Sequence, residues 1–380
     1  MSARPVRLAA LICALSCSAA TAASQEPVRP RAEATEGSAV RAAIALMDQG
    51  LYDQARGALE PLVAARDPDA TYVLGYIHAR GLGTPADETT ARRLFVAAAM
   101  DGQPDAQFAL GELAYTGRGV RRDRARAYEW YDLAAAKGHA RALYMLGVMH
   151  AEGGPVPQDL MRAADLYARA AGAGSTAAMH QLGALHLEGR GVAQSYAEAA
   201  RWFEAAARRG DAESQYNLAL LHDSERLPGP PDLAEAVRWM RQAAAEMPRA
   251  KIAMGLFALR GRGTEQSDEA ARAWFARAAA DEDAEGLFLY AAALAEGLGG
   301  PTDREAALRY AEAALRASAG DPIEVIEERR ALRDQLRALA SASTGAERAA
   351  VAVPRTPSLG TPPGVAAAPV LPPKPRRGLR

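Results

Sequence analysis

Histidine is the residue type whose spacing in this chain first suggests chemistry. Four histidines recur at intervals of 36 residues or twice that, namely His78, His150, His186 and His222. A row of imidazoles could bind a metal ion or respond to pH near neutrality. If each ring sits on its own helix, neighbouring rings lie about 10 Å apart, too far to share a tetrahedral ion with bonds of about 2.1 Å. The spacing therefore favours a packing role, and the isolated His139 and His180 suggest no site.

No combination of side chains predicts a catalytic centre. Both cysteines, Cys13 and Cys17, lie within the first 22 residues, and the sequence contains neither His-Glu-x-x-His nor Gly-x-Ser-x-Gly. Several Gly-x-Gly pairs occur, but none is followed by Lys-Ser or Lys-Thr or preceded by a strand pattern, as a phosphate-binding loop requires. The carboxylates of Asp281 and Asp283 are typical of a solvated turn. We expect a protein that is not an enzyme and has no metal or other cofactor.

Charge is balanced along the chain, and its first residues have the features of an export signal. The formal charge of -1 argues against a nucleic-acid partner. Two arginines precede an apolar run over residues 8–17, and a small-x-small cleavage site ends at Ala22. The run is shorter than the roughly 20 residues of a membrane span. Residues 1–22 are thus predicted to be a signal peptide and the mature protein to be periplasmic or secreted. Lipid anchoring at Cys17 is the weaker alternative.

Glycine sets the period of the rest of the chain. Gly75, Gly111, Gly147, Gly183 and Gly255 are separated by 36 residues or a multiple of it, and Ala219 and Ala291 occupy the two missing places. Each period contains two short amphipathic patterns joined by a glycine-rich turn, which predicts paired helices. Small residues let the paired helices approach closely, and glycine in the turn permits positive φ. Because one hairpin cannot bury its apolar faces alone, neighbouring hairpins must stack.

Aspartate recurs where the second helix of a period should begin. Its side-chain oxygen can accept from the free amides of the first helical turn. The predicted capping residues are Asp87, Asp123, Asp159 and Asp303.

The best-preserved periods, residues 142–174 and 178–210, resemble the Sel1-like repeat, a relative of the tetratricopeptide repeat. The shared pattern runs approximately A-x-x-x-L-G-x-x-Y-x-x-G-x-G-V-x-x-D-x-x-x-A-x-x-W-Y-x-x-A-A-x-x-G. This resemblance implies an all-α fold, a right-handed α-solenoid superhelix of helix–turn–helix repeats. It also implies roles in envelope signalling, cell-surface organisation or host interaction.

The repeats divide the chain into segments. We expect a signal peptide at 1–22, a flexible spacer at 23–36, a degenerate N-terminal hairpin at 37–68, seven repeats at 69–320, a capping helix at 321–340 and a disordered proline-rich basic tail at 341–380. In the fifth repeat, residues 225–231 replace the glycine turn, and the start signals of the second helix come one residue late. A local irregularity is expected there.

The resemblance also implies that the first helix of each repeat lines a partner-binding groove. Positions one, four and five residues after the glycine column are interpreted as those least needed for packing. The predicted contact residues are Tyr76, Arg80, Glu112, Tyr115, Thr116, Glu152, Glu188, Asp223, Ser224, Arg260 and Glu296. Tyrosine, arginine and carboxylates together suit a protein or peptide partner.

The leading hypothesis is a protein–protein interaction scaffold or regulatory adaptor of a bacterial cell envelope; the export signal and the alanine- and arginine-rich composition suggest the bacterial origin. Residues 351–380 contain eight prolines and no acid. The alternative is therefore a module that contacts peptidoglycan or a membrane surface through the tail residues Lys374, Arg376, Arg377 and Arg380, or an accessory subunit of an envelope enzyme. A tail without a partner, and docking of Pro369-x-x-Pro372 as a polyproline II segment, are further possibilities.

Overall fold

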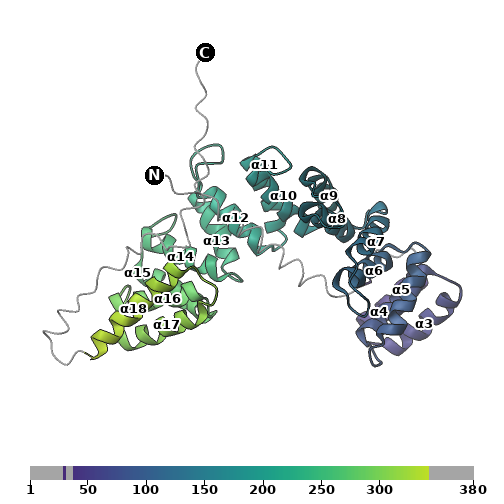
Figure 1. Cartoon of the computed structure of the whole chain (residues 1–380), viewed down its shortest axis with the longest axis horizontal. Coiled ribbons are helices and arrows are strands. Elements are labelled where there is room, and N and C mark those ends of the chain that lie inside the picture. The colour runs from purple at the N-terminus through teal and green to yellow at the C-terminus, as the bar shows by residue number, and fades with distance from the viewer. Residues whose placement is uncertain (1–28, 31–36, 342–380) are drawn as a thin grey trace, which may run out of the picture. The chain divides into compact units, whose positions relative to one another are not determined.

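The computed structural model describes residues 29–30 and 37–341, and over these residues the chain consists of helices joined by turns (Figure 1). The all-α fold class is thereby confirmed. The predicted signal peptide, almost all of the spacer and the tail with its basic residues lie outside the described residues. No helix of the described part is both long and apolar enough to cross a membrane.

The helices follow one another as antiparallel pairs, and one further helix packs on the last pair. They are α2 (Ser38–Asp48), α3 (Tyr52–Ala64), α4 (Pro68–Arg80), α5 (Glu88–Met100), α6 (Pro104–Thr116), α7 (Arg124–Ala136), α8 (Ala140–Glu152), α9 (Leu160–Gly172), α10 (Thr176–Glu188), α11 (Tyr196–Ala207), α12 (Ala212–His222), α13 (Leu233–Ala243), α14 (Pro248–Arg260), α15 (Asp268–Ala280), α16 (Ala284–Glu296), α17 (Arg304–Ala317) and α18 (Ile323–Ser341).

The chain divides into two compact units, residues 1–202 and 203–380. In the described part of the first unit, each helix from α3 to α9 packs against the helix before it and the helix after it. In the second unit the same holds from α13 to α17. Contacts between sequence neighbours are the packing arrangement of a solenoid.

At the glycine column, an aromatic ring from the second helix of the same repeat packs directly against the glycine. A Cβ built on Gly111 in α6 would lie 2.5 Å from Cε1 of Tyr131 in α7, far inside the roughly 3.5–4.0 Å of a normal carbon–carbon contact. The same pairing joins Gly75 to Phe95, Gly147 to Tyr167 and Gly255 to Phe275. In the seventh repeat the glycine place holds Ala291, and the ring place holds Ala311. In that repeat a larger residue at the glycine position thus accompanies a smaller residue at the ring position.

The second glycine of the turn is required by packing as well as by φ. A Cβ on Gly299 would lie 2.3 Å from the carbonyl oxygen of Asp268, at the start of the preceding repeat's second helix. Gly191 approaches the carbonyl oxygen of Leu160 in the same way, with 2.4 Å to its virtual Cβ. Both glycines have positive φ, 61° and 71°. Each turn therefore packs against the N-terminus of the helix one repeat earlier.

The predicted N-caps are confirmed, and further caps occur that the sequence analysis missed. Asp87, Asp123, Asp159 and Asp303 each accept a hydrogen bond from the amide three residues on, at 2.9–3.0 Å. First helices are capped as well, by the side chains of Asp67, Gln103, His139, Ser175, Asp211 and Asp283.

Arginine side chains stack on aromatic rings across repeat boundaries. The guanidinium carbon of Arg141 in α8 lies 4.7 Å from the ring centroid of Phe108 in α6. Arg249 in α14 lies 4.5 Å from the ring of Tyr216 in α12. Both pairs are 33 residues apart, so each joins one repeat to the one before it by a cation–π contact.

The fifth repeat is irregular locally, because α12 and α13 have 11 residues each where most helices of the other repeats have 13. Asp232 caps α13 by accepting from the amide of Glu235 at 3.0 Å, as the shifted start signal predicts. The rebuilt turn is held by Arg262 of the next repeat, whose guanidinium pairs with the Asp223 carboxylate and donates to the Asp223 carbonyl at 2.8 Å.

Helix α18 packs on α17 and is fixed by a buried arginine. The Arg329 side chain is 4% exposed and pairs with Glu285 of α16 at 2.9 Å and with Asp321. Leu332 and Leu336 of α18 join the hydrophobic core formed by α14–α17. Burial raises the pKa of Glu285, although Arg329 opposes the shift. Helix α18 is therefore held on the last repeat by the ion pairs of Arg329 as well as by apolar contacts.

Candidate interaction site

Each repeat brings the end of its first helix and the start of its second helix together at a turn. In the third repeat α8 ends at Glu152 and α9 begins at Leu160, and the Asp159 amide donates to the His150 carbonyl at 2.8 Å. We call residues 150–161 the third turn. The equivalent residues 114–125 of the preceding repeat are the second turn.

Three of the predicted contact residues are buried, which corrects the interpretation that their positions are not needed for packing. Tyr76 and Glu112 are 7% exposed and Tyr115 is 9% exposed. Glu112 accepts a hydrogen bond from the Tyr131 hydroxyl, and burial raises the pKa of Tyr131. The ring of Tyr115 lies 6.5 Å from that of Tyr131. Glu112 and Tyr115 therefore pack against Tyr131 of the second helix, and Tyr76 belongs to the core cluster that α4 forms with α2 and α3.

The other predicted contact residues lie at the surface but do not converge on one site. Arg80, Thr116, Glu152, Arg260 and Glu296 are exposed, and Glu188, Asp223 and Ser224 are half-buried. Several engage neighbours in the chain. Glu188 pairs with Arg190 at 3.2 Å, and the Thr116 hydroxyl donates to the Glu112 carbonyl at 2.7 Å. The predicted residues are therefore distributed over successive repeats.

Arg124, which the sequence analysis did not single out, links two of the predicted residues. Its guanidinium pairs with Glu152 at 2.7 Å, and its guanidinium carbon lies 5.3 Å from the ring centroid of Tyr115. The ion pair thus joins the second and third turns, and the cation–π contact lies within the second turn. The residue type at the position of Arg124 varies among the repeats, so the periodic pattern does not identify this residue.

Two histidines of the column, His150 and His186, have different surroundings. Nε2 of His150 lies 3.4 Å from the Tyr128 hydroxyl, whereas Nδ1 of His186 lies 3.3 Å from the Ala193 carbonyl oxygen. His78 and His222 are half-buried like these two. Within the described ranges, no three His, Cys, Asp or Glu side chains form a group that could hold a metal ion.

His139, isolated in the sequence, has a defined structural role. Its Nδ1 accepts from the Ala142 amide at 3.1 Å and caps α8, so its Nε2 donates to Asp105 at 3.2 Å. Its ring stacks on Phe108, with centroids 4.8 Å apart. Burial is the largest influence on the pKa of Asp105 and acts to raise it, but the hydrogen bond and charge of His139, together with Gln103 and Arg141, outweigh burial and the pKa is lowered.

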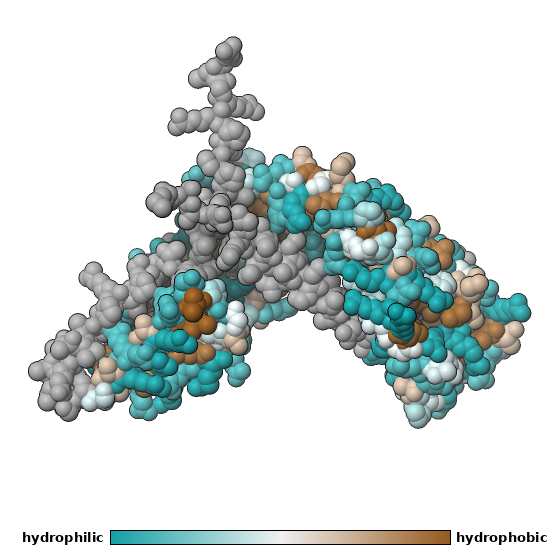
Figure 2. Space-filling view, viewed as in Figure 1, coloured by the Kyte–Doolittle hydropathy of each residue, from teal (hydrophilic) through white to brown (hydrophobic). Residues whose placement is uncertain are grey.

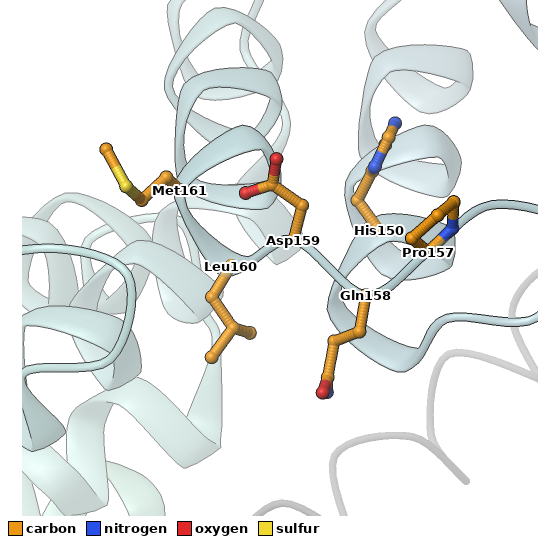
Figure 3. A pocket seen from close by; sticks show the side chains of 6 residues that line it. All are labelled: His150, Pro157, Gln158, Asp159, Leu160 and Met161. Atoms are coloured by element: carbon orange, nitrogen blue, oxygen red, sulfur yellow. The ribbon is translucent and has the colours of Figure 1, made fainter.

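The third turn forms a pocket of about 490 Å³ (Figure 3). It is lined by His150, Pro157, Gln158, Asp159, Leu160 and Met161. The side chains of His150 and Asp159 extend from one side of the turn in this view, and those of Gln158 and Leu160 from the other. Burial lowers the pKa of His150, as does Arg162, while Asp159 acts in the opposite direction. At neutral pH the ring is therefore uncharged.

The repeat pattern identifies the chain. The Sel1 repeat matches residues 68–103, 104–139, 140–175, 176–211, 212–246, 248–283 and 284–318. The chain belongs to the Sel1 repeat family. The seven predicted Sel1-like repeats are thereby confirmed, and each match spans one helix pair, from α4–α5 to α16–α17.

Solved structures of Sel1-repeat proteins share the fold. A protective antigen, c5321, present in uropathogenic Escherichia coli strains and displaying an SLR fold, is 25% identical with a TM-score of 0.69. The similarity covers 78% of this chain and 62% of that one, so the chain spans less than two-thirds of the length of c5321. A Sel1 repeat protein from Oxalobacter formigenes is 27% identical with a TM-score of 0.56, covering 64% of this chain and 97% of that one. No curated protein matches the chain.

Sel1 repeats generally mediate protein–protein interactions, and the third Sel1 repeat departs from the pattern at its turn. Gly153-Gly154-Pro155 stands where the pattern has Gly-x-Gly, and Pro157 and Gln158 stand where the second turn has two arginines. On the face shown in Figure 2, hydrophobic residues form small patches among hydrophilic ones. The third turn therefore differs from the second in the residues that line its pocket.

Proposed function

We propose that this Sel1-repeat protein is a non-enzymatic scaffold or regulatory adaptor of a bacterial cell envelope, which binds a protein or peptide along its first helices and turns. Interaction is the general role of Sel1 repeats. The envelope location rests on the export signal predicted for residues 1–22. Edman sequencing of the protein purified from the periplasm should begin just after Ala22; a cytoplasmic protein starting at Met1 would refute the location.

One observation carries the proposal. The residues that the repeats share are used in packing and capping, whereas the position five residues after the glycine column is exposed or half-buried and holds arginine, glutamate, threonine or serine, depending on the repeat. We call it the variable column: Arg80, Thr116, Glu152, Glu188, Ser224, Arg260 and Glu296. A surface that varies on a repeated framework is suited to recognising one particular partner.

Site-specific photo-crosslinking tests this assignment. A photoreactive amino acid at Thr116 or Arg260 of the variable column should yield discrete crosslinks to an envelope protein in living cells. The matched control places it at Val96 or Arg277, which are exposed on second helices. Equal crosslinking from both sets, or none from the variable column, would refute the proposed binding face.

The basic tail supports the second candidate, a module associated with the cell wall. Lys374, Arg376, Arg377 and Arg380 form a cationic cluster without acids nearby in sequence, which would attract an anionic polymer. Purified sacculi should sediment the full chain but not a chain ending at residue 345. If both forms sediment equally, or neither does, the tail is not a cell-wall anchor.

A further inference from the structure

The pocket of the third turn combines one carboxylate, an uncharged imidazole and apolar side chains. We propose that it binds a lysine side chain of the partner, with the ammonium group at Asp159 and the methylene chain against Pro157 and Met161. This inference rests on the proposed function and deepens it, because it names the chemistry that a partner must present at the third repeat.

The carboxylate of Asp159 favours a compact cation. Its Oδ1 accepts from the Arg162 amide at 2.9 Å as the cap of α9, and the guanidinium of Arg162 pairs instead with Asp165 at 3.1 Å. One carboxylate oxygen thus remains for a ligand. An arginine would use both oxygens through its planar fork, whereas an ammonium group acts as a point charge. Lysine therefore fits this carboxylate better than arginine.

The imidazole of His150 borders the pocket without adding charge. Its Nδ1 is buried and has no hydrogen-bond partner in the described part of the chain, and its Nε2 faces the Tyr128 hydroxyl. The charged groups that act on the ring are Asp159 and Arg162 of α9. Because burial and Arg162 keep the ring neutral at pH 7, it does not repel an ammonium group.

The apolar part of the pocket suits a methylene chain. Pro157 contributes a rigid ring, and Met161, 74% exposed, contributes a flexible thioether that adapts to irregular partners. Lysine buries its four methylenes along such surfaces while its charge stays at the edge. In the second turn, the matching places hold Arg121 and Arg122. That turn repels a lysine, although it carries the equivalent capping residue Asp123.

The probe is N-acetyl-lysine methylamide, titrated into the full chain at pH 7 while the ¹³C-labelled Met161 methyl group is followed by NMR. The uncharged comparison is N-acetyl-norleucine methylamide, which has a similar stem. Asp159→Asn keeps the cap, because asparagine caps helices as well as aspartate does, but removes the charge. Asp123→Asn is the matched control in the second turn.

We expect a saturable shift of Met161 with the lysine probe and affinity at least about fivefold weaker with norleucine, because a hydrogen bond to a charged group is lost. Asp159→Asn should weaken the lysine probe by a similar factor, and Asp123→Asn should leave it unchanged. The absence of a shift, equal affinity for both probes, or unchanged binding in Asp159→Asn would each overturn the proposal. None of these outcomes bears on crosslinking from the variable column, so the proposed function is tested separately.

Discussion

Replacing Gly111 with alanine should destabilise the protein even though alanine is the better helix former. The added methyl would lie 2.5 Å from Tyr131 Cε1, so the ring or the helix must move by about 1 Å to reach a normal contact distance. Overpacking of this kind costs about 1–3 kcal/mol, and the helix-propensity gain offsets about 0.5–1 kcal/mol. The expected net loss of about 1–2 kcal/mol corresponds to a Tm lower by about 1–3 °C for cooperative unfolding of a chain of 380 residues.

Thermal unfolding followed by circular dichroism measures this effect, and two further variants isolate its cause. Gly57→Ala in α3 is the matched control, because no described atom outside its local helix lies within 4 Å of the new methyl group. Its Tm should rise. In a Tyr131→Ala background the clash is absent, and the two positions match the alanine pair Ala291 and Ala311. Gly111→Ala should then be neutral or stabilising. An equal loss of Tm in both backgrounds would refute the steric explanation.

Three further predictions follow from the fold. Because burial raises the pKa of Glu285, the folded chain binds the proton of Glu285 more tightly than the unfolded chain, and the contribution of this group to stability increases as the pH falls from 7 towards 5. Glu285→Gln should remove this contribution from the difference between the Tm values at pH 5 and pH 7. A difference equal to that of the unchanged protein would contradict the prediction. His139→Ala should lose about 1 kcal/mol in urea unfolding through the missing cap, whereas His139→Asn should recover most of it; equal losses would show that capping is unimportant there. Gly299→Ala should lower Tm much more than Gly229→Ala, since both have positive φ but only Gly299 faces a backbone oxygen, that of Asp268; similar losses would mean that φ alone matters.

The sequence predicted those parts of the fold that recur with the period. The glycine column, the capping aspartates and the number of repeats all depend on residues that repeat at one spacing, so the recurrence of a residue type reinforces each signal. Even the late start of α13 could be read from Asp232, because a cap is a local interaction of one side chain with the next helical turn.

The misplaced contact residues depend on side chains that occur once. Glu112 is a charged residue in a column otherwise uncharged, and it is buried because the Tyr131 hydroxyl donates to it. Comparing equivalent positions of the repeats does not reveal the pair of Glu112 and Tyr131, because it occurs in one repeat. The pocket of the third turn is lined likewise by Pro157 and Gln158, which occupy positions that the pattern leaves free. Tertiary partners of single residues cannot be inferred from periodicity, because periodicity averages over them.

The arginine–aromatic pairs across repeat boundaries bear on how such an array can change by duplication. A copied repeat carries its own ring and its own glycine, so its internal packing survives wherever it is inserted. Arg141, however, stacks on Phe108 of the preceding repeat, and a copy of its repeat placed after the fourth would meet His180 at that position instead. Moving a repeat therefore preserves the packing between its own two helices but not its contacts with the neighbouring repeats. The order of the repeats is thus constrained by the contacts across their boundaries.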